Sequence, residues 1–341
     1  NNIRLPFLIP STIIYHDGIF KRHHDTTVQY PRNGLFHLKF AMEKVACQDM
    51  KAPVLNGYKK AISTNSNIDL SEFIEYCAIF YLSTSFSLVV NKILNQFSDF
   101  GENKKDQIAI NMAIPVADIG KESIRIYYEK ILKKSWLISQ KLEHTDNISI
   151  ETIKQFAENS NIGSVPTELC SVYPEVSANV QAFIRSPAAS PDIRTIYFFS
   201  DTGAGTVDQS VFTYTEKLNY LSAEVLPLGS SQIDLKACGD TITFESLEYW
   251  RREKENGSTK IAITDAKHLI EDRLLKETQK ILKETKTRLP TGPGVTPINS
   301  LKKHIRLIFG GGGHSKLPYE SGTIKAVNFF FNTQSHPDIT H

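Results

Sequence analysis

The chain has 341 residues, of which 40% are hydrophobic and 22% charged, and its formal net charge is +2. This composition excludes a disordered chain and predicts a cored protein of one large domain or two ordinary ones, while so small a charge gives no indication of nucleic-acid binding. The four cysteines form no C-x-x-C pair, so we expect reduced thiols and a cytoplasmic location.

The first forty residues predict short strands separated by turns at Asp17-Gly18 and Asn33-Gly34. Farther on, Asp69 and Glu72 have the spacing of a helix cap and its third residue. An uncharged run at residues 76–91 follows. It is shorter than a membrane span and contains Ser, Thr and Asn, so we expect a buried helix or helix pair and no membrane partner.

The rest of the chain mixes strand and helix patterns. A buried strand is expected at residues 107–115 and a helix at 121–139. Residues 195–214 predict a hairpin around a glycine-containing turn, and residues 264–289 predict a long helix. A strand, a glycine loop and a helix are expected to close the chain from residue 304. This mixture indicates an α/β protein.

The turn of the expected hairpin reads "DTGAGTVD" at residues 201–208. Its glycines allow backbone to approach a ligand closely, and successive N–H groups of such a turn can bind phosphate. The turn also supplies a threonine hydroxyl and two carboxylates, and carboxylates beside phosphates usually act through Mg²⁺. These groups suit phosphoryl transfer. The alternative is an ordinary Asp/Gly β-turn that binds no ligand, which the same sequence could form.

A second glycine-rich segment, "IFGGGGHSKLP", covers residues 308–318. Four successive glycines are costly in conformational entropy. They suit a place where a flat ring or a phosphate lies against bare backbone. A disordered linker is the alternative, but it would rarely follow directly on a strand.

The order of these segments resembles the second half of the actin, sugar-kinase and heat-shock chaperone ATPase superfamily. It is most similar to the nucleotide-binding domain of DnaK-type (70-kilodalton heat-shock) chaperones. "VYPEVSAN" (172–179) resembles the family's connector between lobes, and "LGSSQID" (228–234) resembles its Leu-Gly-Gly-Glu-Asp-Phe-Asp segment. The resemblance implies a two-lobed actin-like ATPase fold, each lobe on a ribonuclease-H-like mixed sheet with flanking helices. The lobes would be residues 1–180 and 181–341.

Carried over position by position, the resemblance implies a site for ATP or ADP with Mg²⁺. The catalytic candidates are Asp201, Thr206, Lys39 and Glu175, with Asp201 near the attacking water. The metal-side acids would be Asp201 and Asp208. The residues against the nucleotide would be Gly203, Ala204, Gly205, Gly229, Ser230, Lys254, Gly311, Gly312 and Gly313. For Lys39 and Lys254, a solvated surface lysine is the alternative.

Three features depart from the family pattern. Nothing before "IPSTII", which begins at residue 9, matches the first phosphate loop, so either that hairpin is lacking or the sequence starts after it. Tyr173 stands where the family has an acid before the proline, with Glu175 one place beyond. The stretch between Asp234 and Asp265 is short for the smaller subdomain. These departures weaken the expectation of catalysis more than that of the fold.

The resemblance implies an ATP-binding and hydrolysing conformational switch, a slow Mg-dependent ATPase that acts on protein clients or regulatory partners. Three alternatives stay open: a degenerate scaffold that binds nucleotide or partners without catalysis, a small-molecule kinase, and a filament-forming role. Neither a P-loop nor a Rossmann fingerprint is present in the sequence.

Overall fold

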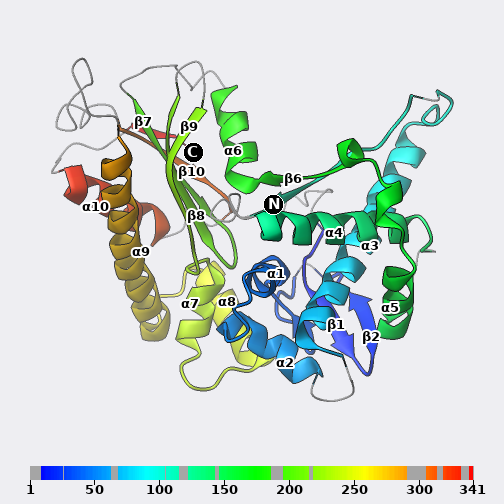
Figure 1. Cartoon of the computed structure of the whole chain (residues 1–341). Helices are drawn as coiled ribbons and strands as arrows, with labels where there is room; N and C mark the ends of the chain where they lie inside the picture. Colours follow the sequence, from blue (N-terminus) through cyan, green and yellow to red (C-terminus); the bar gives the residue numbers. More distant parts are fainter. Residues whose placement is uncertain are drawn as a thin grey trace. The chain divides into compact units, whose positions relative to one another are not determined.

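The computed structural model describes residues 9–25, 27–62, 68–103, 105–114, 122–142, 146–185, 195–214, 218–289, 305–312, 318–331 and 338–340. The chain divides into two compact units (Figure 1). Unit 1 is Asn1–Ile114 with Asp118–Tyr173, and unit 2 is Pro115–Ala117 with Pro174–His341. The sequence placed the boundary after residue 180. That position lies inside helix α6 (Glu175–Ile184), whose Val180 and Phe183 are buried against the sheet of unit 2.

Unit 1 contains a four-stranded antiparallel sheet in the order β3-β1-β2-β5. Its strands are β1 (Ile13–His16), β2 (Ile19–Arg22), β3 (Gly34–Leu35) and β5 (Asn147–Ser149). The predicted turn at Asp17-Gly18 joins β1 to β2, and both residues have positive φ (48° and 78°), as a two-residue hairpin turn of this twist requires. A separate pair consists of β4 (Ile110–Ile114) and β6 (Cys170–Pro174). The strand predicted to be buried at 107–115 corresponds to β4, of which only Ile114 is fully buried.

Helix α3 (Leu70–Gln96) lies at the centre of unit 1, among α1 (Leu38–Ala46), α2 (Asn56–Ile62), α4 (Glu122–Ser139) and α5 (Ile150–Glu158). The short 3₁₀ helices η1 (Pro53–Leu55), η3 (Ile162–Ser164) and η4 (Thr167–Leu169) complete the unit. The predicted cap of α3 is confirmed, because the Asp69 side chain accepts a hydrogen bond from the Ser71 N–H at 3.1 Å. The uncharged run is one helix, and its residues Phe73, Ile74, Cys77 and Phe80 belong to the core.

By length and composition, α3 is the one helix in the described ranges that is long and apolar enough to cross a membrane. In the structure, 61% of its most apolar 18-residue window is buried inside the molecule. The burial is uneven: residues from Phe73 to Phe80 lie in the core, whereas Leu88, Val89 and Leu94 are exposed. Packing against α4, α1 and α5 therefore accounts for the apolar character of its first half.

Unit 2 is built on a five-stranded mixed sheet in the order β11-β10-β7-β8-β9. Its strands are β7 (Ile196–Thr202), β8 (Val207–Tyr214), β9 (Leu218–Leu226), β10 (Ile305–Gly310) and β11 (Asp338–Thr340). The first three are antiparallel neighbours, while β10 runs parallel to β7 and β11 parallel to β10. This arrangement is the ribonuclease-H-like mixed sheet that the sequence predicted.

Helices cover both faces of this sheet (Figure 1). On one face, α6 packs against Tyr197, Phe199 and Phe212. On the other face, α9 (Ile261–Arg288) and α10 (Tyr319–Phe331) pack against the alternate side chains, such as Phe198 and Val211. The central strand β7 is buried on both faces, which explains its continuous apolar run. Helices α7 (Ser231–Ala237) and α8 (Phe244–Glu255) follow β9.

The chain is therefore a mixed α/β protein of sheets with flanking helices, as predicted. The mixed sheet expected in both lobes is present in unit 2, whereas the described strands of unit 1 form the antiparallel sheet and the β4–β6 pair. The predicted long helix is α9, and the predicted closing strand and helix are β10 and α10.

Candidate functional site

The predicted hairpin is formed by β7 and β8, and it brings the two candidate metal-side acids together. Asp201 pairs directly with Asp208 across the ladder, so both side chains leave the same face of the sheet. Asp208 is 6% exposed, and its Oδ2 accepts a hydrogen bond from Thr206 Oγ1 at 3.0 Å. Like charges placed directly opposite each other destabilise a sheet. A cation bound between the carboxylates would offset that cost.

The turn between the strands, residues 203–206, is held from one side by residues 229–231. Three consecutive carbonyl groups of the turn accept hydrogen bonds from N–H groups: Gly203 O from Ser230 (3.0 Å), Ala204 O from Ser231 (2.9 Å) and Gly205 O from Gly229 (3.2 Å). The Ser231 hydroxyl also donates to the Ala204 carbonyl at 2.6 Å. The turn is closed by a hydrogen bond from the Gly203 N–H to the Thr206 carbonyl at 2.9 Å.

This arrangement leaves N–H groups of the turn available on the opposite side. The C=O and N–H of a trans peptide point in opposite directions, so the N–H groups of Ala204 and Gly205 face away from residues 229–231. Among the described residues, neither of these two N–H groups donates to an acceptor. Neighbouring N–H groups of this kind bind anions. The turn therefore offers two donors to a phosphate, next to the carboxylate pair.

Two glycines make the close contacts around the turn possible. A Cβ atom on Gly229 would lie less than 3.0 Å from backbone atoms of Ala204, Gly205 and Thr206. Gly311 has a φ of 81°, and a Cβ there would lie less than 3.0 Å from Oδ1 of Asp201. Only glycine fits at both positions without displacing backbone or the carboxylate.

The glycine loop after β10 lies beside the hairpin, because Gly310 pairs with Asp201 in the parallel ladder. Both Gly311 and Gly312 are exposed, but Gly312 has no left-handed φ, and no described atom lies within 4 Å of its Cβ position. Gly312 therefore borders open space at the place where the sequence predicted a nucleotide. The predicted Gly313 lies outside the described residues.

Lys254 of α8 supports the segment that holds the turn. Its ammonium lies 2.7 Å from Oδ1 of Asp234 in α7 and donates to the Ser230 carbonyl at 2.8 Å. The sequence predicts this lysine against the nucleotide, and that contact stays a prediction; within the protein, the ammonium binds Asp234 and Ser230. The pKa of the nearby Tyr319 phenol is raised, mainly by burial and secondly by the negative charge of Asp234. This hydroxyl therefore stays neutral over the physiological pH range.

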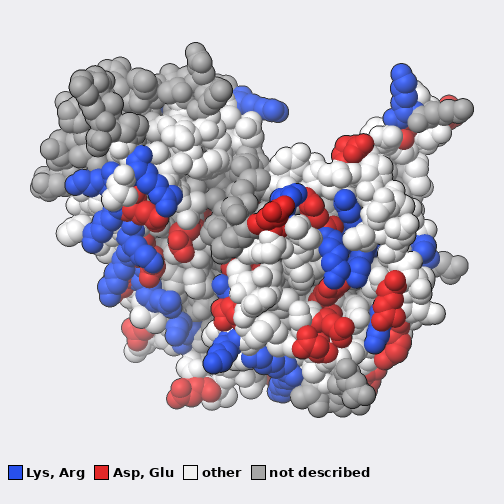
Figure 2. All heavy atoms as spheres, in the orientation of Figure 1, with Lys and Arg blue, Asp and Glu red and all other residues white. Residues whose placement is uncertain are grey.

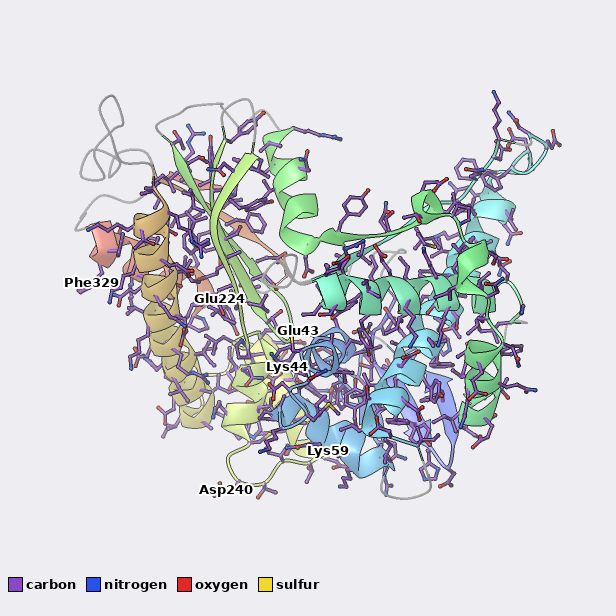
Figure 3. The ribbon with its side chains drawn as sticks, viewed as in Figure 1. Glu43, Lys44, Lys59, Glu224, Asp240 and Phe329 are labelled. Carbon is purple, nitrogen blue, oxygen red and sulfur yellow. The ribbon has the colours of Figure 1, made fainter. Side chains whose placement is uncertain are left out.

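The two remaining catalytic candidates lie apart from the turn in the chain. Glu175 is the first residue of α6, the helix that covers the sheet face on which Asp201 and Asp208 lie. Lys39 belongs to unit 1, in the first turn of α1, where its carbonyl accepts the Tyr128 hydroxyl at 3.1 Å. Glu43 and Lys44 follow on the same helix and form an ion pair at 2.9 Å (Figure 3).

The donor set of unit 2 fits a phosphate with a divalent cation. Among the described residues, no group of three or more His, Cys, Asp or Glu side chains could hold a metal alone. Mg²⁺ needs no such cage, because one or two carboxylates hold it together with substrate phosphates and water. Asp201 and Asp208 would hold the cation, and the Ala204 and Gly205 N–H groups would hold the phosphate.

Sequence reasoning missed two residues of this site, Ser231 and Asp234. Both lie in "LGSSQID", the segment whose Gly229 and Ser230 were predicted. The signal available was the second of two serines at the start of a short helix, since a serine there often bonds to backbone. Its acceptor, the Ala204 carbonyl, lies 27 positions earlier in the chain and is not visible from local pattern.

No protein-family model and no curated protein matches the chain. Solved structures are similar at low identity. A 15-stranded ParM filament from Clostridium botulinum is 14% identical, with 95% of this chain and 93% of that chain covered and a TM-score of 0.45. A PilM–PilN type IV pilus biogenesis complex is 13% identical, with 76% and 75% covered and a TM-score of 0.37. The ethanolamine utilization protein EutJ from Carboxydothermus hydrogenoformans is 13% identical, with 78% and 70% covered and a TM-score of 0.37.

Proposed function

We propose that unit 2 binds ATP or ADP with Mg²⁺ and that the chain is an ATP-hydrolysing conformational switch of the actin-like ATPase superfamily, similar to DnaK-type chaperones. The observation that carries the proposal is the interlocked turn. Its Gly203, Ala204 and Gly205 carbonyls are bound by residues 229–231, the N–H groups of Ala204 and Gly205 face away from that segment, and Gly311 brings the glycine loop against Asp201. A turn that needed no ligand would not require three separate segments to meet in this way.

Each residue of the site would have a separate role in phosphoryl transfer. The N–H groups of Ala204 and Gly205 would bind the phosphate oxygens, and Thr206 would hold Asp208 in place through its hydroxyl. Asp201 would orient the attacking water. Bound Mg²⁺ would neutralise charge on the transferred phosphoryl group. The bare backbone at Gly312 would accept the flat face of the nucleoside.

The output of such a switch would be read by protein clients or regulatory partners. We propose a cytoplasmic protein on the basis of its thiols: Cys77, Cys170 and Cys238 are free, and the first two are buried. Free cysteines of this kind fit a reducing compartment, where disulfides are rare.

Isothermal titration calorimetry with Mg·ATP and Mg·ADP tests the proposal on the parent and on Gly312→Val. A valine side chain at Gly312 enters open space and strains no backbone, so it is expected to leave the melting temperature unchanged. It is expected to weaken nucleotide binding at least about tenfold, because it occupies the ligand's place. Gly57→Val is the matched control, because the Cβ position of Gly57 in α2 also has no described atom within 4 Å.

Binding by the parent that is lost in Gly312→Val supports the nucleotide site. Undiminished binding by Gly312→Val, or no binding by the parent, contradicts it. Measurement of the phosphate released from ATP then distinguishes a hydrolysing switch from a degenerate scaffold that binds nucleotide without catalysis. Asp201→Asn is expected to retain binding and to lose most of the hydrolysis. A parent that binds ATP without any turnover would instead be the degenerate scaffold.

A further inference from the structure

Helix α9 carries a line of positive charge on the side turned away from the core. Leu269, Arg273, Lys276, Lys280 and Lys283 follow one another at intervals of four, three, four and three residues, so they form one line along the helix. All five side chains are exposed, and we name them the outer stripe of α9. The buried residues of the helix, such as Leu274 and Ile281, occupy the opposite side. Figure 2 shows Lys and Arg gathered over the region that α9 occupies in Figure 1.

The four cations of the outer stripe lie on one exposed line of the helix. Some other helical cations of this protein pair with carboxylates on the same helix, as Arg125 does with Glu129 at 2.7 Å and Arg288 with Glu284 at 2.6 Å. In the described part of the chain, no carboxylate oxygen lies within 4.0 Å of a stripe cation. Like charges three and four residues apart destabilise a helix. Asp272, Glu277 and Glu284 lie three or four residues from stripe cations and offset part of this repulsion, and an acidic partner would relieve the rest.

The surroundings of the stripe favour a protein over a nucleic acid. Leu269, at the start of the line, is 43% exposed, and Ile261, eight positions earlier on α9, is 78% exposed. These apolar side chains suit the apolar residues of a protein partner. Carboxylates also flank the stripe, at Asp272, Glu277 and Glu284. A continuous phosphate backbone would meet those carboxylates, whereas a helix can present acids to the stripe and other residues to its flanks.

We propose that the outer stripe of α9 docks an acidic helix of a protein partner, with a leucine or similar side chain on that helix against Leu269. Glutamates at the same intervals on the partner would face Arg273, Lys276, Lys280 and Lys283 in turn. The stripe repeats every seven residues, which is the spacing at which two helices stay in register along their length. The proposal concerns a surface away from the nucleotide turn and does not depend on nucleotide binding.

The test uses a synthetic helical peptide with one leucine and four glutamates at the stripe's intervals. A second peptide has the same composition with the glutamates distributed around the helix. Binding is measured by fluorescence anisotropy at low ionic strength, where surface charges are least screened. The stripe variant changes all four cations to Gln: Arg273→Gln, Lys276→Gln, Lys280→Gln and Lys283→Gln. The control variant removes the same charge at four other exposed lysines: Lys21→Gln, Lys51→Gln, Lys92→Gln and Lys236→Gln.

The ordered peptide is expected to bind the parent and the control variant alike, and to bind the stripe variant about tenfold more weakly, as the loss of four surface ion pairs implies. The redistributed peptide is expected to bind the parent more weakly than the ordered one. Three results overturn the proposal: unchanged binding by a stripe variant that melts like the parent, equal binding of the two peptides, and tighter binding of a DNA duplex than of the ordered peptide.

Discussion

The ammonium of Lys254 lies 2.7 Å from Oδ1 of Asp234 and also donates to the Ser230 carbonyl at 2.8 Å. The Asp234 side chain is 1% exposed and that of Lys254 is 12% exposed. This desolvated ion pair therefore joins α7 to α8, and through Ser230 it also contacts the segment that holds the 203–206 turn.

Lys254→Met should destabilise unit 2, because it leaves the Asp234 carboxylate buried without its counter-charge. Breaking one side of a buried pair costs about 3 kcal/mol or more. Urea unfolding followed by circular dichroism measures the loss, with exposed Lys236→Met as a control that should change stability by less than about 0.5 kcal/mol. The double variant Lys254→Met with Asp234→Asn should recover part of the loss. Equal effects of the two lysine variants would contradict the prediction.

Gly229→Ala should disrupt the turn, because its methyl group would overlap the backbone of Ala204, Gly205 and Thr206. We expect a loss of about 2 kcal/mol or more, of the size that overpacking produces. Gly57→Ala provides the matched comparison: it adds the same methyl group in open space within α2 and should gain about 0.5–1 kcal/mol from helix propensity. Thermal melts of the two variants should therefore shift in opposite directions. A Gly229→Ala protein as stable as the parent would show that the turn can move away.

Gln209→Leu should destabilise the packing of α9 and α10 on the sheet. The Gln209 side chain is fully buried, accepts from Thr278 Oγ1 at 2.9 Å and donates to Ser200 Oγ at 3.3 Å. A leucine would leave these hydroxyls buried without their partner, at a cost of about 2–4 kcal/mol. Denaturant titration measures this cost, and Gln181→Leu at an exposed position of α6 is the control. A loss no larger than the control's would mean that water replaces the amide.

Glu75 gives unit 1 a defined response to acid. Burial is the largest influence on the pKa of Glu75 and acts to raise it, but hydrogen bonds from Lys134 (2.8 Å) and Lys130 (3.0 Å) outweigh burial and lower that pKa below 4.5. A carboxyl group whose pKa is lower in the folded state contributes stability above its unfolded pKa, and this contribution disappears as the pH falls through the folded pKa.

The parent should therefore lose part of its free energy of unfolding as the pH falls below about 4.5. Glu75→Gln should be less stable than the parent at neutral pH, and the difference between the two should shrink as the solution becomes more acidic. Chemical denaturation across this pH range measures it. Glu122→Gln, whose carboxyl is 78% exposed, should behave like the parent throughout. A constant difference between Glu75→Gln and the parent at all pH values would refute the assigned pKa direction.

Local patterns in the sequence predicted the elements that local chemistry determines. Two strand patterns around the glycine-containing turn "DTGAGTVD" indicated the β7–β8 hairpin, and the acceptor at Asp69 indicated the start of α3. The support of the turn was not predictable in this way. Ser231 and the Lys254–Asp234 pair act across distances in sequence that only the folded sheet brings together.

The boundary between the two units was also not predictable from local sequence patterns. "VYPEVSAN" was interpreted as a connector, so the division was placed after it. The burial of Val180 and Phe183 against Tyr197 instead makes α6 part of unit 2, and nothing in the connector's own residues reveals the strand that they cover. Likewise, Gly311 has a positive φ and close neighbours whereas Gly312 has neither, although nothing in the sequence distinguishes these two adjacent glycines.

The dependence of the turn on residues 229–231 also has a consequence for the order of folding. The hairpin is local in sequence, but residues 229–231, which bind its carbonyls, follow β9 in the chain. An excised peptide covering residues 195–214 should therefore form strands without binding phosphate. A ligand that binds only the finished turn stabilises only chains in which α7 has docked. Binding of an anion would then report that folding of this part of the molecule is complete.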